Sequence, residues 1–299
     1  MYLPIGITTM TDQDKAIESR ISEKAVDSFN DAPNARYKQI MRSLVRHLHA
    51  FVSEVELTEQ EWFEGIRFLT ETGHKCDGLV RQEFILLSDT LGVSMLVDAI
   101  NHRHSASATD TTVFGPFYIE GMPEREFGEN MAFTPGEAAL VRGRVVDTQG
   151  KPLADAVLDV WQTAENGMYS GQDTEQPFGN LRGRYRTDAN GYFAIRTIVP
   201  VCYPIPTDGP VGRMLDAANR HPWRPAHLHF MIDAPGYRKL VTHLFNHDDP
   251  YLDSDAVFGV KHSLQVIYED RVSHDDLSAD LGMQVPFKRA CYEFVMEAE

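Results

Sequence analysis

The hydrophobic pattern of this chain changes period near residue 105, and this change constrains the fold more than any other feature. Before it, apolar residues recur at helical spacing, and Thr58 and Glu61 form a capping box that opens one such segment. After a connecting stretch, short runs alternate between apolar and polar residues and are separated by turn residues. We therefore expect an α+β chain, with helices over 1–105 and a mainly antiparallel β-sandwich over 106–299.

The periodicity also gives approximate element bounds. Helices are predicted over about 12–29, 35–54 and 78–101. A further helix is predicted in the segment that the capping box opens. The segment 78–101 is apolar on most sides, which is typical of a helix pair buried within a subunit or between subunits. Strands are predicted over about 140–146, 156–163, 192–198, 226–233, 240–245 and 263–268. Two long loops, 164–190 and 199–225, are the expected carriers of function.

Composition and charge exclude several classes of protein. The 299 residues are 42% hydrophobic and 24% charged, which are ordinary values for a globular chain. A net charge of -16 disfavours nucleic acid as a partner. The sequence contains no apolar run long enough to span a membrane, and its amino terminus does not resemble a signal peptide. The three cysteines have no paired spacing, so we expect a cytoplasmic, reducing location.

The segment Arg224-Pro-Ala-His227-Leu-His229 reads as a strand that aims two imidazoles the same way. On a strand, alternate residues share a face, so the two histidines lie opposite the apolar residues Leu228 and Phe230. Two converging imidazoles are half of a metal site, and zinc is the usual first candidate for such a pair. The strand therefore predicts a metal centre that needs further ligands.

Two other His-x-His pairs lie in different surroundings. His47 and His49 fall in a segment with helical spacing, where residues two apart point away from each other. His102 and His104 follow an apolar run and lead into a loop, so solvated side chains are expected there. Neither pair is predicted to chelate a metal.

Each of the two long loops carries a tyrosine that could complete the metal site. Tyr169 lies in Gly-Met-Tyr-Ser and Tyr203 in Val-Cys-Tyr-Pro-Ile-Pro. A phenolate is a hard anionic ligand suited to ferric iron, because a trivalent cation lowers the pKa of the phenol. Taken singly, a tyrosine in a loop is more often a packing residue than a ligand.

These motifs, in this order and at these separations, resemble those of the intradiol ring-cleaving dioxygenases. The resemblance extends to Leu-Asp-Val-Trp-Gln at 158–162, to Arg-Tyr-Arg-Thr-Asp at 184–188 and to the helical segment 81–89. It covers essentially the whole chain. The amino-terminal helices match the catechol and hydroxyquinol branch of the family, in which they form a linker and dimerisation domain that precedes the catalytic β-sandwich.

The resemblance implies that Fe(III) is bound by Tyr169, Tyr203, His227 and His229. It implies that Tyr203 also accepts a substrate proton, and that Arg224 stabilises negative charge on the ring. The implied reaction opens an aromatic diol with O2 to a cis,cis-muconate and incorporates both oxygen atoms. His243 falls where the catechol-cleaving members carry a glutamine. The family usually forms homodimers through the amino-terminal helices, often with a bound phospholipid.

The pocket segments most resemble those of the members that cleave hydroxyquinol, 1,2,4-trihydroxybenzene, to 3-hydroxy-cis,cis-muconate, the enol form of maleylacetate. Asp89 offers a physical reason, because an acidic acceptor could bind the extra hydroxyl. The predicted substrate-binding residues are Leu86, Asp89, Val113, Phe114, Gly115, Pro116, Phe117, Ile205, Pro206, Arg224 and Val257.

Three alternatives remain open from the sequence. The first is preference for catechol or a chlorocatechol over hydroxyquinol. The second is a zinc hydrolase that adds His243 or His247 to the pair, with the carboxylates of Asp248 and Asp249 nearby. The third is a non-catalytic binding sandwich with a helical dimerisation arm.

Overall fold

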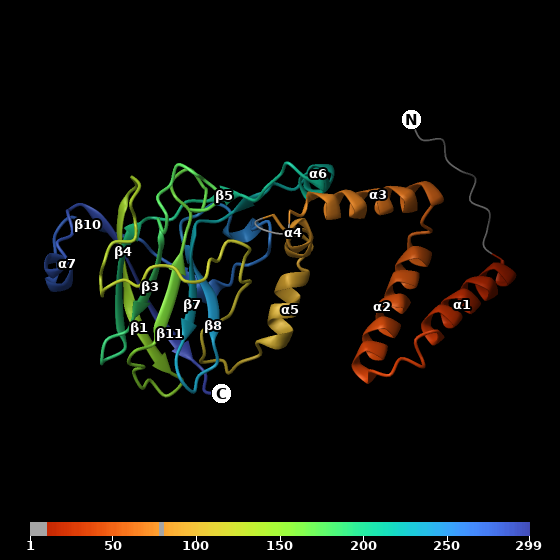
Figure 1. Ribbon diagram of the computed structural model, residues 1–299, viewed down its shortest axis with the longest axis horizontal. Helices are drawn as coiled ribbons and strands as arrows, with labels where there is room; N and C mark the ends of the chain where they lie inside the picture. Colours follow the sequence, from red (N-terminus) through yellow and green to blue (C-terminus); the bar gives the residue numbers. More distant parts are fainter. Residues whose placement is uncertain (1–10, 78–80) are drawn as a thin grey trace. The chain divides into compact units, whose positions relative to one another are not determined.

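The computed structural model describes residues 11–77 and 81–299, and its elements are labelled in Figure 1. The chain forms two compact units, Met1–Leu69 and Thr70–Glu299. Two parts of the predictions fall outside the described residues: the amino-terminal segment 1–10 and the first three residues of the predicted helix over 78–101.

The first unit is helical, as the apolar spacing predicts. It contains α1 (Asp12–Asp27), α2 (Ala35–Glu54) and the greater part of α3 (Glu59–Lys75). The predicted capping box begins α3, since the Glu61 carboxylate accepts the amide and hydroxyl hydrogens of Thr58. Helices α1 and α2 pack against each other, and the hydroxyl of Ser22 lies 2.9 Å from Nδ1 of His49.

The second unit holds a β-sandwich built from two larger sheets and one small sheet. The strands are β1 (Ala138–Asp147), β2 (Val157–Trp161), β3 (Arg182–Arg186), β4 (Tyr192–Ile198), β5 (Tyr203–Pro204), β6 (Trp223–Arg224), β7 (His227–Asp233), β8 (Leu240–Asn246), β9 (Gln265–Val266), β10 (Glu269–Arg271) and β11 (Phe287–Met296). Their order is β10-β11-β1-β4, β3-β2-β7-β8-β9 and β5-β6. Pairings β1 with β11 and β8 with β9 are parallel, and the others are antiparallel. The predicted mainly antiparallel sandwich is therefore confirmed, although each of the two larger sheets contains one parallel pairing and is mixed.

The core lies between the two larger sheets, where inward-facing side chains of alternate residues meet. Val141 and Val145 come from β1, Leu158 from β2, and Phe230 from β7, and each is almost fully buried. Phe193 of β4 contacts Phe230 with ring centroids 6.2 Å apart. Alternation along each strand leaves the opposite face of β7 free to carry other side chains.

The predicted helix pair consists of α4 (Glu83–Thr90) and α5 (Val93–Asn101), joined at Gly92, which has a φ of 73° that favours glycine. Helix α4 buries Leu86, Leu87 and Asp89, whereas α5 exposes most of its apolar residues. Both helices belong to the same compact unit as the sheets, although the hydrophobic pattern of the sequence changes from helical to alternating only after them.

Among the described residues, no helix has the length and apolar character needed to cross a membrane.

The two long loops contain more regular structure than the sequence predicts. The segment 164–190 includes β3, and 199–225 includes β5, β6 and α6 (Pro210–Ala217). Pro210 at the first turn of α6 is a helix-start signal that the prediction overlooked. The remaining short elements are η1 (Leu252–Ser254), η2 (His262–Leu264) and α7 (Asp276–Asp280).

Candidate metal centre and active-site cavity

Strand β7 presents two histidines on the face opposite the sandwich core. Leu228, Phe230 and Ile232 point into the core, and His227 and His229 alternate with them. The Nε2 atoms of the two histidines lie 3.1 Å apart, and each side chain is only 2% exposed. The period of the strand thus brings two imidazole nitrogens to one buried point.

Two tyrosines reach the same point from the segments that the sequence singled out. The hydroxyl oxygen of Tyr169 lies 2.9 Å from Nε2 of His229 and 3.1 Å from the hydroxyl oxygen of Tyr203. Gly167, with a φ of 76°, allows this approach, because a Cβ there would lie 3.0 Å from Cβ of Tyr203. Four electron-rich atoms from β7, β5 and the loop after β2 therefore converge.

Hydrogen bonds on the far sides of the imidazoles orient their lone pairs. Nδ1 of His227 donates to the carbonyl oxygen of Pro225 at 2.7 Å, so its Nε2 carries the lone pair. Nδ1 of His229 lies 2.7 Å from Nε2 of His243. When His229 is neutral with its Nε2 lone pair facing the tyrosines, Nδ1 is the donor to His243. Both rings can then act as metal ligands.

Burial sets the protonation of these groups in the absence of a cation. Burial and the nearby Arg224 lower the pKa of His227 to about 3, and burial holds the pKa of His229 and of His243 well below the ordinary value. Burial, together with the neighbouring Tyr203, raises the pKa of Tyr169 well above that of a free phenol. Neutral imidazoles are ready to bind a metal, whereas the Tyr169 phenol needs a cation to lose its proton.

The donor set fits a transition-metal ion. Imidazole nitrogens bind such ions readily, and phenolate oxygens add negative charge. Ligand atoms of His227, His229 and His243 all lie within 4.8 Å of one another. His243 contacts the Nδ1 side of His229, however, so it lies behind that ring rather than at the point where the four donor atoms meet. His243 is therefore placed to orient a ligand.

Aromatic stacking fixes two of the converging side chains. Trp161 stacks on His229 with centroids 4.6 Å apart and planes 13° apart. Phe117 stacks on Tyr169 with centroids 4.7 Å apart and planes 22° apart. Such packing limits the rotamers of both rings and keeps water out.

Arg224 lies directly beside the histidines and is 4% exposed. Its Nη1 donates to Nε2 of His227 at 3.3 Å, and its Nε donates to Asp255 at 3.1 Å. Burial opposes the charged guanidinium, but the Asp255 carboxylate, together with the nearby Tyr203 and Tyr169, more than offsets this, so the pKa of Arg224 lies above its ordinary value. A fixed positive charge therefore borders the site.

A cavity of about 360 Å³ opens onto this cluster. Its lining includes every predicted substrate-binding residue except Phe114, whose ring instead packs against Trp161 and Tyr118. Tyr203 lines the cavity, whereas Tyr169 does not. Asp89 forms part of the wall, and burial raises the pKa of its carboxyl group. A volume of this size suits a small aromatic ligand.

Five further residues line the cavity without having been predicted: Asp77, Arg81, Gln82, Gly171 and Gln172. Arg81 and Gln82 directly precede α4, and Gln172 follows Tyr169 in a turn where its side chain accepts the amide hydrogen of Tyr169 at 3.0 Å. Their closeness to Leu86 and Tyr169 in the sequence was the available signal.

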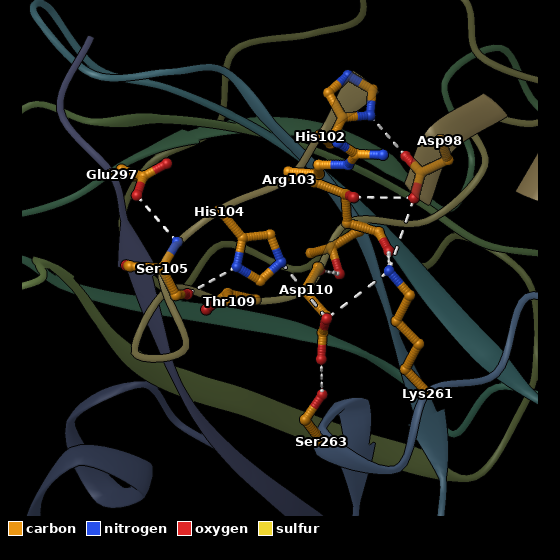
Figure 2. Close-up of polar contacts among 12 residues, drawn as sticks. Asp98, His102, Arg103, His104, Ser105, Thr109, Asp110, Lys261, Ser263 and Glu297 are labelled. Carbon is orange, nitrogen blue, oxygen red and sulfur yellow. Dashed lines mark hydrogen bonds and ion pairs between the residues drawn. The ribbon is translucent and has the colours of Figure 1, made fainter. Parts of the chain in front are cut away.

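The other two His-x-His pairs do not converge. His47 and His49 lie on α2 and contact different partners, the carbonyl oxygen of Ser43 and the hydroxyl of Ser22. His102 ends α5, and His104 lies in the following segment, where Figure 2 shows them contacting carboxylates rather than each other. His102 is about half exposed, and His104 is more buried than the expected solvated side chain.

Comparisons with known proteins show which family this sequence matches. Residues 113–298 match the family model described as Dioxygenase, and residues 34–109 match the model described as Catechol dioxygenase N terminus. A 6-chlorohydroxyquinol 1,2-dioxygenase of Cupriavidus pinatubonensis is 52% identical over 248 residues, which are 83% of this chain and 90% of that protein. A hydroxyquinol 1,2-dioxygenase of a Rhizobium species is 48% identical over 280 residues, 93% of this chain and 94% of that one.

The solved structures include a hydroxyquinol 1,2-dioxygenase from Pseudomonas putida with 78% sequence identity. It superimposes with a TM-score of 0.92 over 95% of this chain and 100% of that chain. The resemblance thus spans both the helices and the sandwich. The chain belongs to the intradiol ring-cleaving dioxygenase family.

Proposed function

We propose that this protein opens the ring of hydroxyquinol with O2 and releases 3-hydroxy-cis,cis-muconate, the enol form of maleylacetate. The observation that carries the proposal is the convergence of two imidazoles and two phenols beside a cavity of aromatic size. The extensive identity to hydroxyquinol 1,2-dioxygenases supports this substrate over catechol.

The proposed metal is Fe(III), bound by Tyr169, Tyr203, His227 and His229. Two anionic phenolates suit a trivalent ion better than they suit zinc. Ferric iron in this position would withdraw charge from a substrate dianion and so make the ring reactive toward O2. Trp161 and Phe117, which stack on His229 and Tyr169, would hold the ligands in place and exclude water.

Tyr203 and Arg224 have distinct proposed roles toward the substrate. Tyr203 is the phenol that lines the cavity, so its hydroxyl oxygen is the one that a substrate hydroxyl can reach and to which it can pass a proton. Arg224 places a buried guanidinium beside the same wall, where it would stabilise negative charge that develops on the ring.

Asp89 on α4 is the proposed partner of the third hydroxyl of hydroxyquinol. Its side chain is buried in the cavity wall and has a hydrogen bond with Ser94, and a substrate hydroxyl would donate a further hydrogen bond to its carboxyl group. Catechol has no such hydroxyl and would leave this buried group without that partner. Preference for hydroxyquinol follows from this difference.

The test is a comparison of initial rates on hydroxyquinol, catechol and 4-chlorocatechol, with the ring product identified under ¹⁸O2. We expect the highest kcat/KM on hydroxyquinol and two labelled oxygen atoms in the product. The variant Asp89→Asn should lower kcat/KM on hydroxyquinol by about 10- to 100-fold and change the value on catechol much less. Asp253→Asn, an exposed carboxylate in η1, is the matched control. Faster turnover of catechol by the unaltered enzyme would contradict the proposed substrate.

We further propose a homodimer assembled through the amino-terminal helices, with 1–105 as linker and dimerisation domain and 106–299 as catalytic domain. Helices α1 and α2 expose apolar side chains that include Ile21, Leu44, Leu48 and Phe51. A second copy and a phospholipid acyl chain could cover such surfaces. Light scattering should give twice the chain mass, and mass spectrometry of a solvent extract should detect the lipid. A monomer that contains no lipid would contradict both.

A cytoplasmic location is part of the same proposal. All three cysteines, Cys76, Cys202 and Cys291, are free thiols, which suits a reducing compartment. Cell fractionation is the direct test, and recovery in an extracellular fraction would contradict it.

A further inference from the structure

The guanidinium of Arg224 has two edges in different surroundings. Its Nε and Nη2 donate to the two carboxylate oxygens of Asp255, at 3.1 and 3.4 Å. Its Nη1 instead donates to Nε2 of His227 at 3.3 Å. One edge is thus occupied by a fixed acceptor, and the remaining nitrogen is directed at the candidate metal centre.

Asp255 is itself held rigidly. Its side chain is almost fully buried, and its two oxygens accept the backbone amides of Val257 at 3.2 Å and Gly259 at 2.9 Å. Burial favours the protonated acid, but the charge of Arg224 and the hydrogen bonds from Arg224 and the Val257 amide together outweigh it, so the pKa of Asp255 lies below its ordinary value. The pair is therefore a buried ion pair with its acceptor fixed by backbone.

The backbone closes tightly around this pair. A Cβ on Gly259 would lie 3.0 Å from Nη2 of Arg224 and 3.1 Å from Oδ2 of Asp255, so a side chain there would crowd both groups. Val257, one of the two residues whose amides donate to Asp255, also lines the cavity. The segment 255–259 therefore shapes the cavity wall and the orientation of Arg224 together.

We propose that Asp255 is a positioning residue that acts through Arg224. By engaging Nε and Nη2, it fixes the guanidinium plane and leaves Nη1 facing the place where the ring acquires negative charge. A misoriented guanidinium would still bind the substrate anion, but it would stabilise the transition state less. The inference rests on the proposed ring-cleavage function.

The test is a double-mutant cycle with Asp255→Asn, Arg224→Gln and the combined variant. We expect Asp255→Asn to lower kcat about 10- to 100-fold with little change in KM, and Arg224→Gln to lower kcat about 100- to 1,000-fold. If Asp255 acts through Arg224, the combined variant is no slower than Arg224→Gln alone. Losses that multiply would overturn the proposal, because they would show that Asp255 acts independently of Arg224. An unchanged kcat in Asp255→Asn would also overturn it.

Two further measurements separate positioning from folding. Anaerobic binding of hydroxyquinol, followed by the visible spectrum of the iron-loaded enzyme, should be nearly unchanged in Asp255→Asn, whereas a collapsed site would lose binding. Loss of binding together with loss of activity would overturn the proposal. Asp255→Glu keeps the charge but lengthens the side chain, and we expect it to recover part of the lost kcat. Asp253→Asn is the control.

The cycle also distinguishes this inference from the proposed substrate. If the unaltered enzyme cleaves catechol faster than hydroxyquinol, the substrate assignment fails, and the same cycle run with catechol still tests the coupling of Asp255 to Arg224. An additive cycle on either substrate overturns only the inference about Asp255.

Discussion

Two His-x-His pairs in the second unit have the same spacing in the sequence, but one lies on a buried strand and the other lies where a helix gives way to a loop. His227 and His229 alternate along β7, are buried, and bring their Nε2 atoms to 3.1 Å. His102 caps the end of α5 and His104 lies in the segment that follows, and each contacts its own carboxylate: Asp98 lies 2.7 Å from His102 and Asp110 lies 3.4 Å from His104. Figure 2 shows this second group as a network around Lys261.

The difference lies in how charge is balanced. In the network of Figure 2, the ammonium of Lys261 lies 3.6 Å from Asp98 and 3.7 Å from Asp110 and also donates to the carbonyl oxygen of Thr111, so positive and negative groups alternate. At β7, electron-rich nitrogen and oxygen atoms face one another in a dry site. Such atoms repel unless protons or a cation lie between them. The charges in the network of Figure 2 therefore balance one another, whereas the cluster at β7 has the donor set of a candidate metal site.

The largest expected contrast comes from removing one histidine of each pair. His229→Ala should abolish bound iron and lower kcat/KM by at least about 1,000-fold, since several kcal/mol of charge stabilisation depends on the metal. His104→Ala should leave iron content and kcat/KM nearly unchanged. Metal analysis and initial rates measure both. Equal losses from the two variants would remove the distinction between the pairs.

A smaller effect is expected at His243, which contacts Nδ1 of His229. His243→Leu removes this hydrogen bond, and loss of such a partner typically weakens metal binding about 10- to 100-fold. His243→Gln restores a hydrogen-bonding group and should recover part of the affinity. Competition with a chelator gives the affinities, and a value for His243→Leu equal to that of the unaltered protein would show that His243 does not support His229.

The smallest effect is expected in the network of Figure 2. Lys261 is partly exposed, so Lys261→Met should lower the free energy of unfolding by about 1 kcal/mol or less and leave iron content unchanged. Lys239→Met removes an exposed ion pair with Asp233 and is the matched control. Urea unfolding measures both. Loss of iron from Lys261→Met would mean that the two clusters are coupled.

The sequence predicted the parts of the structure that depend on local patterns, such as the alternation of residues along a strand. The alternation that buries Leu228 also directs His227 and His229 to the opposite face, and the capping box at Thr58 does begin a helix. The family resemblance then supplied most of the cavity lining, including Asp89 and Val257.

The rest depends on tertiary contacts that no local pattern encodes. Phe114 packs against Trp161 instead of lining the cavity. Strand β11 pairs in parallel with β1, to which it is connected by a long stretch of chain, and neither its position nor that of β3 was predicted. The pairing of Asp255 with Arg224 joins residues 31 apart, so only the folded chain reveals it.

The most direct test of the metal centre is the visible absorption spectrum of the iron-loaded enzyme, compared at equal iron content with Tyr169→Phe and Tyr203→Phe. Tyrosinate bound to Fe(III) absorbs in the visible by charge transfer, so we expect a red protein whose band shifts or weakens in each variant. Tyr192→Phe, which alters an exposed tyrosine of β4, should leave the band unchanged. A colourless iron-loaded protein, or a band that neither Tyr169→Phe nor Tyr203→Phe alters, would contradict the assignment of these tyrosines as ligands.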